Sequence, residues 1–154
     1  MQHPWIRALL CSAGLAACCV WLLCFGVGSA GARTLACRQW SIKGAWATSQ
    51  GNDFHVMFDF TQTRKTLGGT ASLSASEQAR AGYASPNAKI TGTINGNHLS
   101  VRAYWKRGSA TIVGQYIGMV SRGSVRGNGR DITDPGAAAV SWSGTGPTSC
   151  LSTH

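Results

Sequence analysis

The sequence of 154 residues predicts an all-β domain, an eight-stranded antiparallel up-and-down barrel, preceded by a signal segment. Apolar and polar residues alternate with period two in successive short runs, which is typical of strands with one buried and one solvent-facing side. Turn signals separate these runs. Only 12% of the residues are charged, about half the usual share, which excludes a coiled coil or a long surface helix. A β-sandwich is the alternative arrangement.

The first half of the domain contains three alternating runs, at positions 39–46, 54–61 and 67–73. They turn these residues to the inner side: Trp40, Ile42, Gly44 and Trp46; Phe54, Val56, Phe58 and Phe60; Leu67, Gly69, Ala71 and Leu73. The triplet Gly51-Asn52-Asp53 is a turn signal between the first two runs. Residues 77–87 form the longest connection and are expected to be a loop, with one or two helical turns at 74–81.

The second half contains alternating runs at 89–94, 99–105, 112–118 and 140–143. Their inner sides are Ile90, Gly92 and Ile94; Leu99, Val101, Ala103 and Trp105; Ile112, Gly114, Tyr116 and Gly118; Val140 and Trp142. Asn95-Gly96 between two such runs is the strongest hairpin signal. Residues 125–132 are the weakest strand, with two glycines and little apolar content. Consecutive hairpins favour a meander that closes on itself and so leaves no exposed edge.

The first 32 residues are expected to be a signal peptide. Arg7 precedes an apolar run over 8–27, and Ala30-Gly31-Ala32 supplies small residues for cleavage after Ala32. Two alternatives remain. The run is long enough to cross a bilayer as an uncleaved anchor, and Leu15-Ala16-Ala17-Cys18 matches a lipobox that lipidates Cys18. All three place the single domain 33–154 outside the cytoplasm, secreted, periplasmic or membrane-anchored.

The cysteines agree with an exported domain. Four of the six lie in the signal segment, which leaves Cys37 and Cys150 near the two ends of the domain. An even number of cysteines in an oxidising compartment predicts a disulfide between them. We expect this bond at the closure of the barrel, where the first and last strands meet. Because no C-x-x-C motif or histidine cluster accompanies them, neither a metal site nor a cofactor is expected.

The domain is basic. Residues 33–154 contain 13 Lys and Arg against 5 Asp and Glu, a net charge of +8. A basic domain outside the cytoplasm favours an anionic surface, such as lipid headgroups or acidic glycans, or a protein as its partner. The basic residues are scattered, and the only adjacent pairs are Arg64-Lys65 and Lys106-Arg107. No run is typical of a nucleic-acid-binding arm, so no specific nucleic acid is expected.

Several short motifs resemble the avidin/streptavidin family. Gly44-Ala45-Trp46 followed by Asn52-Asp53-Phe54-His55-Val56 is similar to its first hairpin, and Leu67-Gly68-Gly69-Thr70 to its next strand. Residues 99–106 and 109–118 resemble its central hairpin, and Gly114-Gln115-Tyr116 is the closest match. The likeness covers about 80 residues with gaps, and the G-x-W motif also opens lipocalins. It implies an avidin-like or lipocalin-like barrel.

The resemblance also implies where a ligand would bind. Thr48 and Asn52 occupy the places of polar groups in the family's biotin pocket, and Trp105 matches one of its tryptophans. Ala71 replaces a tyrosine, and Arg126-Gly127-Asn128-Gly129 stands where another tryptophan is usual. We therefore expect no biotin binding of avidin strength. The ligand-binding candidates are Trp46, Thr48, Asn52, Trp105 and Tyr116.

Catalytic groups are scarce. His55 and His98 fall on outward positions, and the domain has one Glu and four Asp, so no enzyme activity is expected. Trp40, Trp46, Trp105 and Trp142 fall on inward positions, where they fill the core or line a cavity. Two functions follow. One is an exported small barrel that binds a small apolar or planar molecule at its mouth. The alternative is a basic extracytoplasmic interaction or inhibitor module with a filled barrel and no small ligand.

Overall fold

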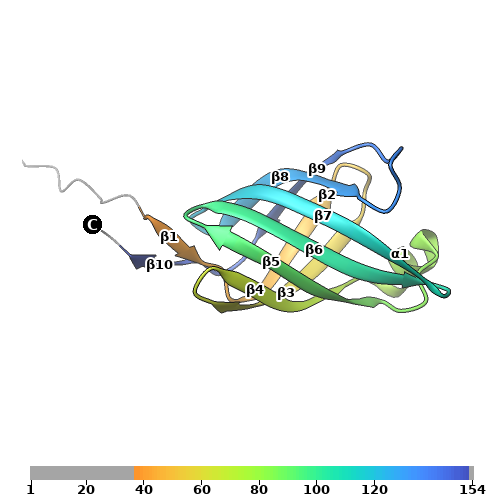
Figure 1. Cartoon of the computed structure of the whole chain (residues 1–154), viewed down its shortest axis with the longest axis horizontal. Coiled ribbons are helices and arrows are strands. Elements are labelled where there is room, and N and C mark those ends of the chain that lie inside the picture. The colour runs from red at the N-terminus through yellow and green to blue at the C-terminus, as the bar shows by residue number, and fades with distance from the viewer. Residues whose placement is uncertain (1–36, 153–154) are drawn as a thin grey trace, which may run out of the picture. The chain divides into compact units, whose positions relative to one another are not determined.

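The computed structural model describes residues 37–152, and the predicted signal segment lies outside them. Eight antiparallel strands form a closed barrel (Figure 1). They are β2 (Gly44–Gln50), β3 (His55–Thr63), β4 (Thr66–Ser72), β5 (Asn87–Asn95), β6 (His98–Arg107), β7 (Ala110–Ser121), β8 (Ser124–Asp131) and β9 (Val140–Thr145). Each strand pairs with the next, and β9 pairs back onto β2. The up-and-down barrel is confirmed, and the sandwich alternative is excluded.

The period-two pattern places the expected side chains inside. Trp46, Trp105 and Trp142 are each exposed by 3% or less. An aromatic cluster fills the middle of the barrel: Phe58 stacks on Phe60 and meets Tyr116 edge-on, and Tyr116 meets Trp142 edge-on. Such pairs add about 0.5–1.5 kcal/mol each beyond the area they bury. The middle of the barrel is therefore a packed core.

Glycines in β7 and β8 make room for these rings. A side-chain carbon added at Gly129 would lie 3.1 Å from the Tyr116 ring, and one at Gly118 would lie 3.1 Å from the Trp142 ring. Both contacts are tighter than ordinary van der Waals packing. Residues 125–132 were the weakest predicted strand because they contain glycines and few apolar residues. The structure explains this composition, since the large rings packed against β8 leave little space for a side chain at Gly129.

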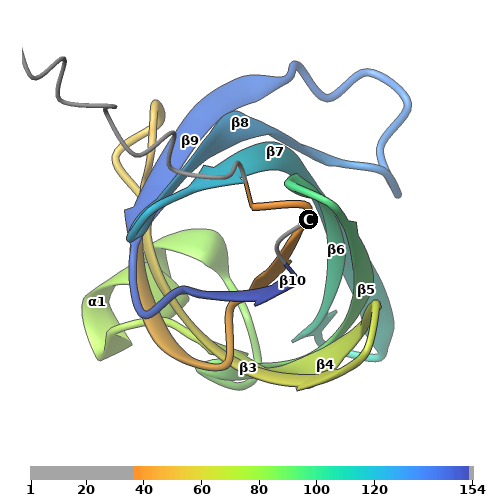
Figure 2. The ribbon, with the colours of Figure 1, turned by 90° about the vertical axis from the view of Figure 1, so that its left-hand side faces the viewer.

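The run 39–46, predicted as one strand, is two. Residues Gln39–Ser41 form β1, and β2 begins at Gly44, whose φ of 101° suits only glycine. β1 pairs with β10 (Ser149–Ser152) in a separate two-stranded ribbon. Figure 2, a view along the barrel, shows the ribbon across one end of it. Trp40, expected inside the barrel, is half-buried on this ribbon and packs against the core.

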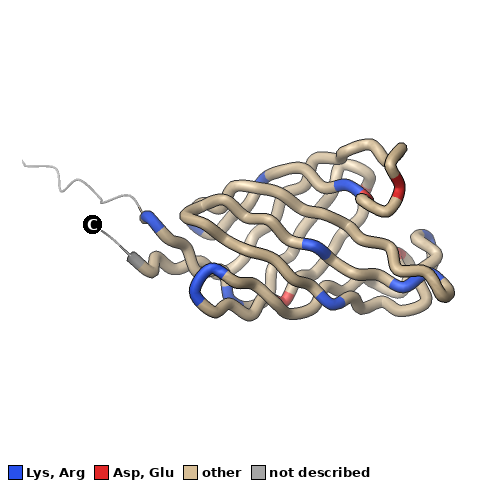
Figure 3. Tube along the Cα trace, viewed as in Figure 1, with Lys and Arg blue, Asp and Glu red and all other residues tan. Residues whose placement is uncertain are grey.

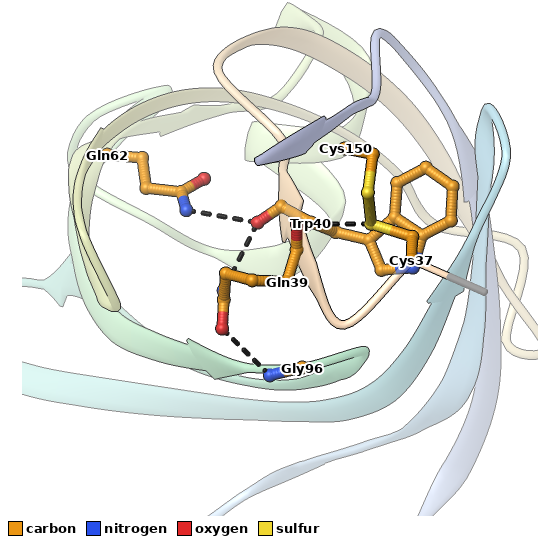
Figure 4. The surroundings of a disulfide bond; sticks show 6 residues. All are labelled: Cys37, Gln39, Trp40, Gln62, Gly96 and Cys150. Carbon is orange, nitrogen blue, oxygen red and sulfur yellow. Dashed lines mark hydrogen bonds between the residues drawn. A yellow bond between two sulfur atoms is a disulfide. The ribbon is translucent and has the colours of Figure 1, made fainter. Parts of the chain in front are cut away.

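The Cys37–Cys150 disulfide belongs to the ribbon. The two Cα atoms are 5.6 Å apart, so the predicted pairing is present. Its expected place at the barrel closure is wrong, because β2 and β9 close the barrel by backbone pairing alone. The disulfide instead ties β1 to β10 (Figure 4). The physical reason is the break after Ser41, which separates the cysteine-bearing residues from the first barrel strand.

Polar side chains fasten the ribbon to the barrel end. Gln62 donates from Nε2 to the Trp40 carbonyl at 3.1 Å (Figure 4). It also accepts from the Ile42 N–H at 2.9 Å. Gln39 accepts from the Gly96 N–H at 3.0 Å. Gln62 is 6% exposed, and these bonds satisfy the polar atoms of its amide. These bonds hold the ribbon across this end of the barrel.

A short helix, α1 (Ala75–Ala81), confirms the helical turns expected at 74–81 within the long connection. The Ser74 side chain accepts from the Glu77 N–H, Glu77 caps the Ser74 N–H in return, and Gly82 ends the helix with a φ of 68°. None of its residues is buried, so no apolar stripe marks it in the sequence. No helix in residues 37–152 has the length and apolar character needed to span a membrane.

Candidate functional site

A cavity of about 220 Å³ lies at the barrel end opposite the ribbon. The β2–β3 turn, the connection that contains α1, the β6–β7 turn and the loop of residues 132–139 surround this end (Figure 1). Four aromatic residues line the cavity: Phe54, Tyr83, Trp105 and Tyr116. Its polar lining comes from Gln50, Asn52, Arg130 and Asp131, and Ala137 and Ala138 complete the rim. An aromatic hollow with a few polar groups is the common form of a small-molecule site.

One wall is a stacked pair of aromatic rings. Tyr83 lies flat on Trp105, with centroids 5.1 Å apart and planes 5° from parallel. The Arg107 guanidinium carbon lies 5.3 Å from the Tyr83 ring centroid. Tyr83 comes from the connector after α1, whereas Trp105 comes from β6. This wall therefore joins a barrel strand to the segment that covers the mouth.

The floor of the cavity holds a buried phenol. Gln50 donates from Nε2 to the Tyr116 hydroxyl oxygen at 3.2 Å. Burial raises the pKa of Tyr116 far above its usual range, the nearby Tyr83 raises it further, and the Gln50 bond lowers it. Burial also raises the pKa of Tyr83. Tyr116 therefore stays protonated, and its O–H proton is available to an acceptor in the cavity.

Trp105 supplies a second donor. Its indole N–H makes no hydrogen bond within residues 37–152. Every buried polar side-chain atom in those residues has a partner, so this N–H is not a buried atom. Since Trp105 is only 2% exposed and lines the cavity, its N–H lies on the accessible cavity surface. A ligand acceptor would therefore meet two donors from the barrel itself, Trp105 and Tyr116.

Polar contacts hold α1 against the β2–β3 turn at the mouth end of the barrel. Arg80 donates to the Asp53 carbonyl at 2.5 Å, and its guanidinium lies 4.0 Å from the Phe54 ring centroid. Glu77 accepts from the His55 N–H at 2.5 Å, and Ala84 donates to the Lys106 carbonyl at 2.7 Å. Because the helix buries no residue, surface bonds and Tyr83 stacking hold this cover in place.

The five predicted ligand residues divide into two groups. Asn52, Trp105 and Tyr116 come together at the cavity. Trp46 lies deeper in the core, with its N–H donated to the Ile42 carbonyl at 3.0 Å. Thr48 is buried and donates from Oγ1 to the Val56 carbonyl at 2.7 Å. The fold therefore uses the polar groups of Trp46 and Thr48, and neither lines the cavity.

Sequence reasoning missed Tyr83, Gln50 and Asp131 as lining residues. Tyr83 lies in the long connection, where no periodicity marks a functional side chain. Asp131 caps a turn, because its side chain accepts from the Thr133 N–H at 2.8 Å. It also lines the cavity. The available signal was positional, because Gln50 and Asp131 each end a strand at the open end of the barrel.

The chain matches no protein-family model, no curated protein and no solved structure. The resemblance to the avidin/streptavidin family therefore rests on the short motifs alone. Within residues 37–152, no group of three or more His, Cys, Asp and Glu side chains is placed to hold a metal ion. The site is defined by its shape and its hydrogen-bonding groups.

Proposed function

We propose that this protein is an exported small β-barrel that binds a small, planar, largely apolar molecule in the mouth cavity. The observation that carries the proposal is the aromatic cavity itself, with the Trp105 and Tyr116 donors at its surface. The cavity favours this function over the alternative of a filled barrel without a ligand. Trp105 and Tyr116 are both nearly buried, so the inner side of a bound molecule would lie against groups that are shielded from water.

The cavity volume limits the size of the ligand. About 220 Å³ exceeds the roughly 150 Å³ that holds benzene in an engineered core cavity. It is below the roughly 300 Å³ at which pockets for drug-sized molecules begin. A molecule of one or two fused rings fits between these limits. We expect its acceptor atom to face Trp105 and Tyr116, and its edge to face Asn52 at the rim.

Export is part of the proposal. The Cys37–Cys150 disulfide is compatible with an oxidising compartment, since such bonds are rare in reducing cytosol. The apolar run before the domain and the Ala30-Gly31-Ala32 site support a cleaved signal peptide. N-terminal sequencing of extracytoplasmic protein is expected to begin at Arg33. Recovery of the full-length chain from the cytosol would contradict this part of the proposal.

Native mass spectrometry of protein purified from its own host tests the ligand. We expect a retained small molecule that is released on denaturation. Ala138→Trp fills the mouth and is expected to abolish retention, because Ala138 lines the cavity. Ala139→Trp is the matched control, since its neighbour Ala139 lines a hollow on the outer face instead. Equal retention in the two variants would show that the ligand, if any, lies elsewhere.

A further inference from the structure

The outer face of β5–β8 carries charge of one sign. By strand alternation its outward residues include Lys89, Arg102, Lys106, Arg126 and Arg130, all of which are exposed. None of the outward residues on these four strands is Asp or Glu. Figure 3 shows blue segments recurring along the strands that face the viewer. We call the outward residues of β5–β8 the basic face.

Two exposed apolar side chains lie within the basic face. Ile117 and Met119 on β7 are each 53% exposed, although neighbouring inward residues of β7 are buried. The strand register places Met119 opposite Arg126 on β8 and Ile117 opposite Asn128. One row further along, Gln115 lies between Arg102 on β6 and Arg130 on β8. Arginines therefore flank the apolar pair.

A hollow of about 570 Å³ lies at this place on the surface. Ile117, Met119, Arg126, Asn128 and Arg130 contribute to its lining, together with His98. Gly118, Gly127 and Gly129 also border it, and they contribute backbone atoms only. The hollow is large enough to receive a side chain from another molecule, and its edge carries guanidinium groups.

Three arginines of the basic face, two of which line the hollow, have no partner of opposite charge. In residues 37–152, Arg102, Arg126 and Arg130 make neither an ion pair nor a side-chain hydrogen bond. A guanidinium binds a carboxylate through two parallel hydrogen bonds, and this geometry is stronger than a lysine contact. Arg and Met are also enriched in protein interfaces. The basic face therefore offers both halves of an interface, an apolar hollow and free carboxylate-binding groups.

We propose that the basic face docks an acidic segment of a partner protein, with an apolar side chain in the hollow and carboxylates on Arg102, Arg126 and Arg130. The strands of the basic face belong to the closed barrel, so a partner cannot add a strand there and must be recognised through side chains. A second copy of the chain is disfavoured, because a two-fold contact sets the same arginines against one another. A hollow also suits a protruding side chain better than a flat lipid surface.

A random peptide display library selected on the purified protein tests the proposal. The enriched peptides are expected to contain an apolar residue flanked by Asp or Glu. Their recovery on the Arg102→Glu/Arg126→Glu variant is expected to fall by about tenfold or more. The matched control is Lys43→Glu/Lys65→Glu, which makes the same change in net charge at exposed positions outside the basic face. This control is expected to keep recovery within about twofold.

A second variant separates shape from charge. Ile117→Ser/Met119→Ser keeps every charge and is expected to reduce recovery as well, while thermal unfolding shows that both variants fold. Enriched peptides without acidic residues, an equal loss in the lysine control, or no enrichment would overturn the proposal. So would binding to phosphatidylserine vesicles or duplex DNA in place of peptides, or a dimer that dissociates in the serine variant. Arg130 lines both the hollow and the mouth cavity, but none of the substituted residues lines the mouth cavity, so the two proposals fail separately.

Discussion

Tyr83 and Trp105 lie face to face at the mouth of the barrel, with ring centroids 5.1 Å apart and ring planes 5° from parallel. Trp105 belongs to the barrel wall, whereas Tyr83 belongs to the connector that follows α1. The stacked pair therefore couples the cover to the cavity. A planar ligand entering the mouth meets an aromatic surface that the protein has already assembled.

Removing the Tyr83 ring is expected to loosen the cover at small cost to the barrel. Tyr83→Ala should destabilise the protein by about 0.5–1.5 kcal/mol beyond the lost buried area, the usual value of an aromatic pair. Ligand retention should fall, because one cavity wall is lost. Tyr104→Ala is the control, since Tyr104 lies on the outer side of β6 and bonds Thr91. Urea denaturation and native mass spectrometry measure the two effects, and identical retention in both variants would contradict the assignment of Tyr83.

The two tryptophans of the predicted site are expected to respond differently. Trp46 is 1% exposed, does not line the cavity and packs against Phe60, so Trp46→Ala should cost about 3–5 kcal/mol of stability. Trp105 already borders the cavity, so Trp105→Ala should destabilise the protein less than Trp46→Ala does and should reduce ligand retention more. Denaturant midpoints with unchanged slopes measure the stability difference. A larger stability cost at Trp105 than at Trp46 would show that the mouth is part of the packed core.

The disulfide is expected to stabilise the ribbon and the whole fold without being required for barrel closure. Cys37 and Cys150 are separated by 113 positions, and a loop of that length is worth roughly 4–5 kcal/mol in the chain-entropy account. Cys37→Ala/Cys150→Ala should therefore lower Tm while the far-ultraviolet circular dichroism of the β-sheet persists. Loss of the β-sheet spectrum at low temperature would mean that β2–β9 pairing depends on the ribbon.

Acid is expected to release α1. Partial desolvation raises the pKa of Glu77, but hydrogen bonds from Ser74 and the His55 N–H, with the His55 charge, outweigh it and lower that pKa. A depressed folded-state pKa stabilises the cap above the unfolded value of about 4.3, and this stability is lost as pH falls through the folded value. The protection factors of the α1 amides, which are corrected for the slower intrinsic exchange in acid, should therefore fall below about pH 4. In Glu77→Gln, protection should be lower at neutral pH and change less with acid.

Biotin is expected not to bind with avidin strength. Ala71 and the glycine-rich β8 stand where the resemblance implies a tyrosine and a tryptophan of the pocket. The Thr48 hydroxyl already donates to the Val56 carbonyl. The protein should pass through a biotin matrix without retention. Tight retention that free biotin releases would show that the cavity groups serve the same purpose in a different arrangement.

The barrel could be predicted from the sequence because strand alternation is a local property. The alternation within a run such as 99–105 shows which side chains lie on the same side of the strand. A slip of one residue in strand pairing would expose all of the inward side chains to solvent. The inward placement of Trp46, Trp105 and Trp142 follows from that rule alone. The Cys37–Cys150 pair was likewise predictable, since only two cysteines lie in the domain.

The tertiary structure alone decided what those inward side chains do. Trp46 and Trp105 share the same local pattern, yet one donates its N–H to Ile42 in the core and the other borders the cavity. The stacking of Tyr83 on Trp105 joins two residues from different elements that no periodicity relates. The ribbon across the closed end likewise depends on the turn after Ser41 and on Gln62, far away in sequence. Period two determines the side of a strand, whereas the position along the barrel axis depends on contacts between distant segments.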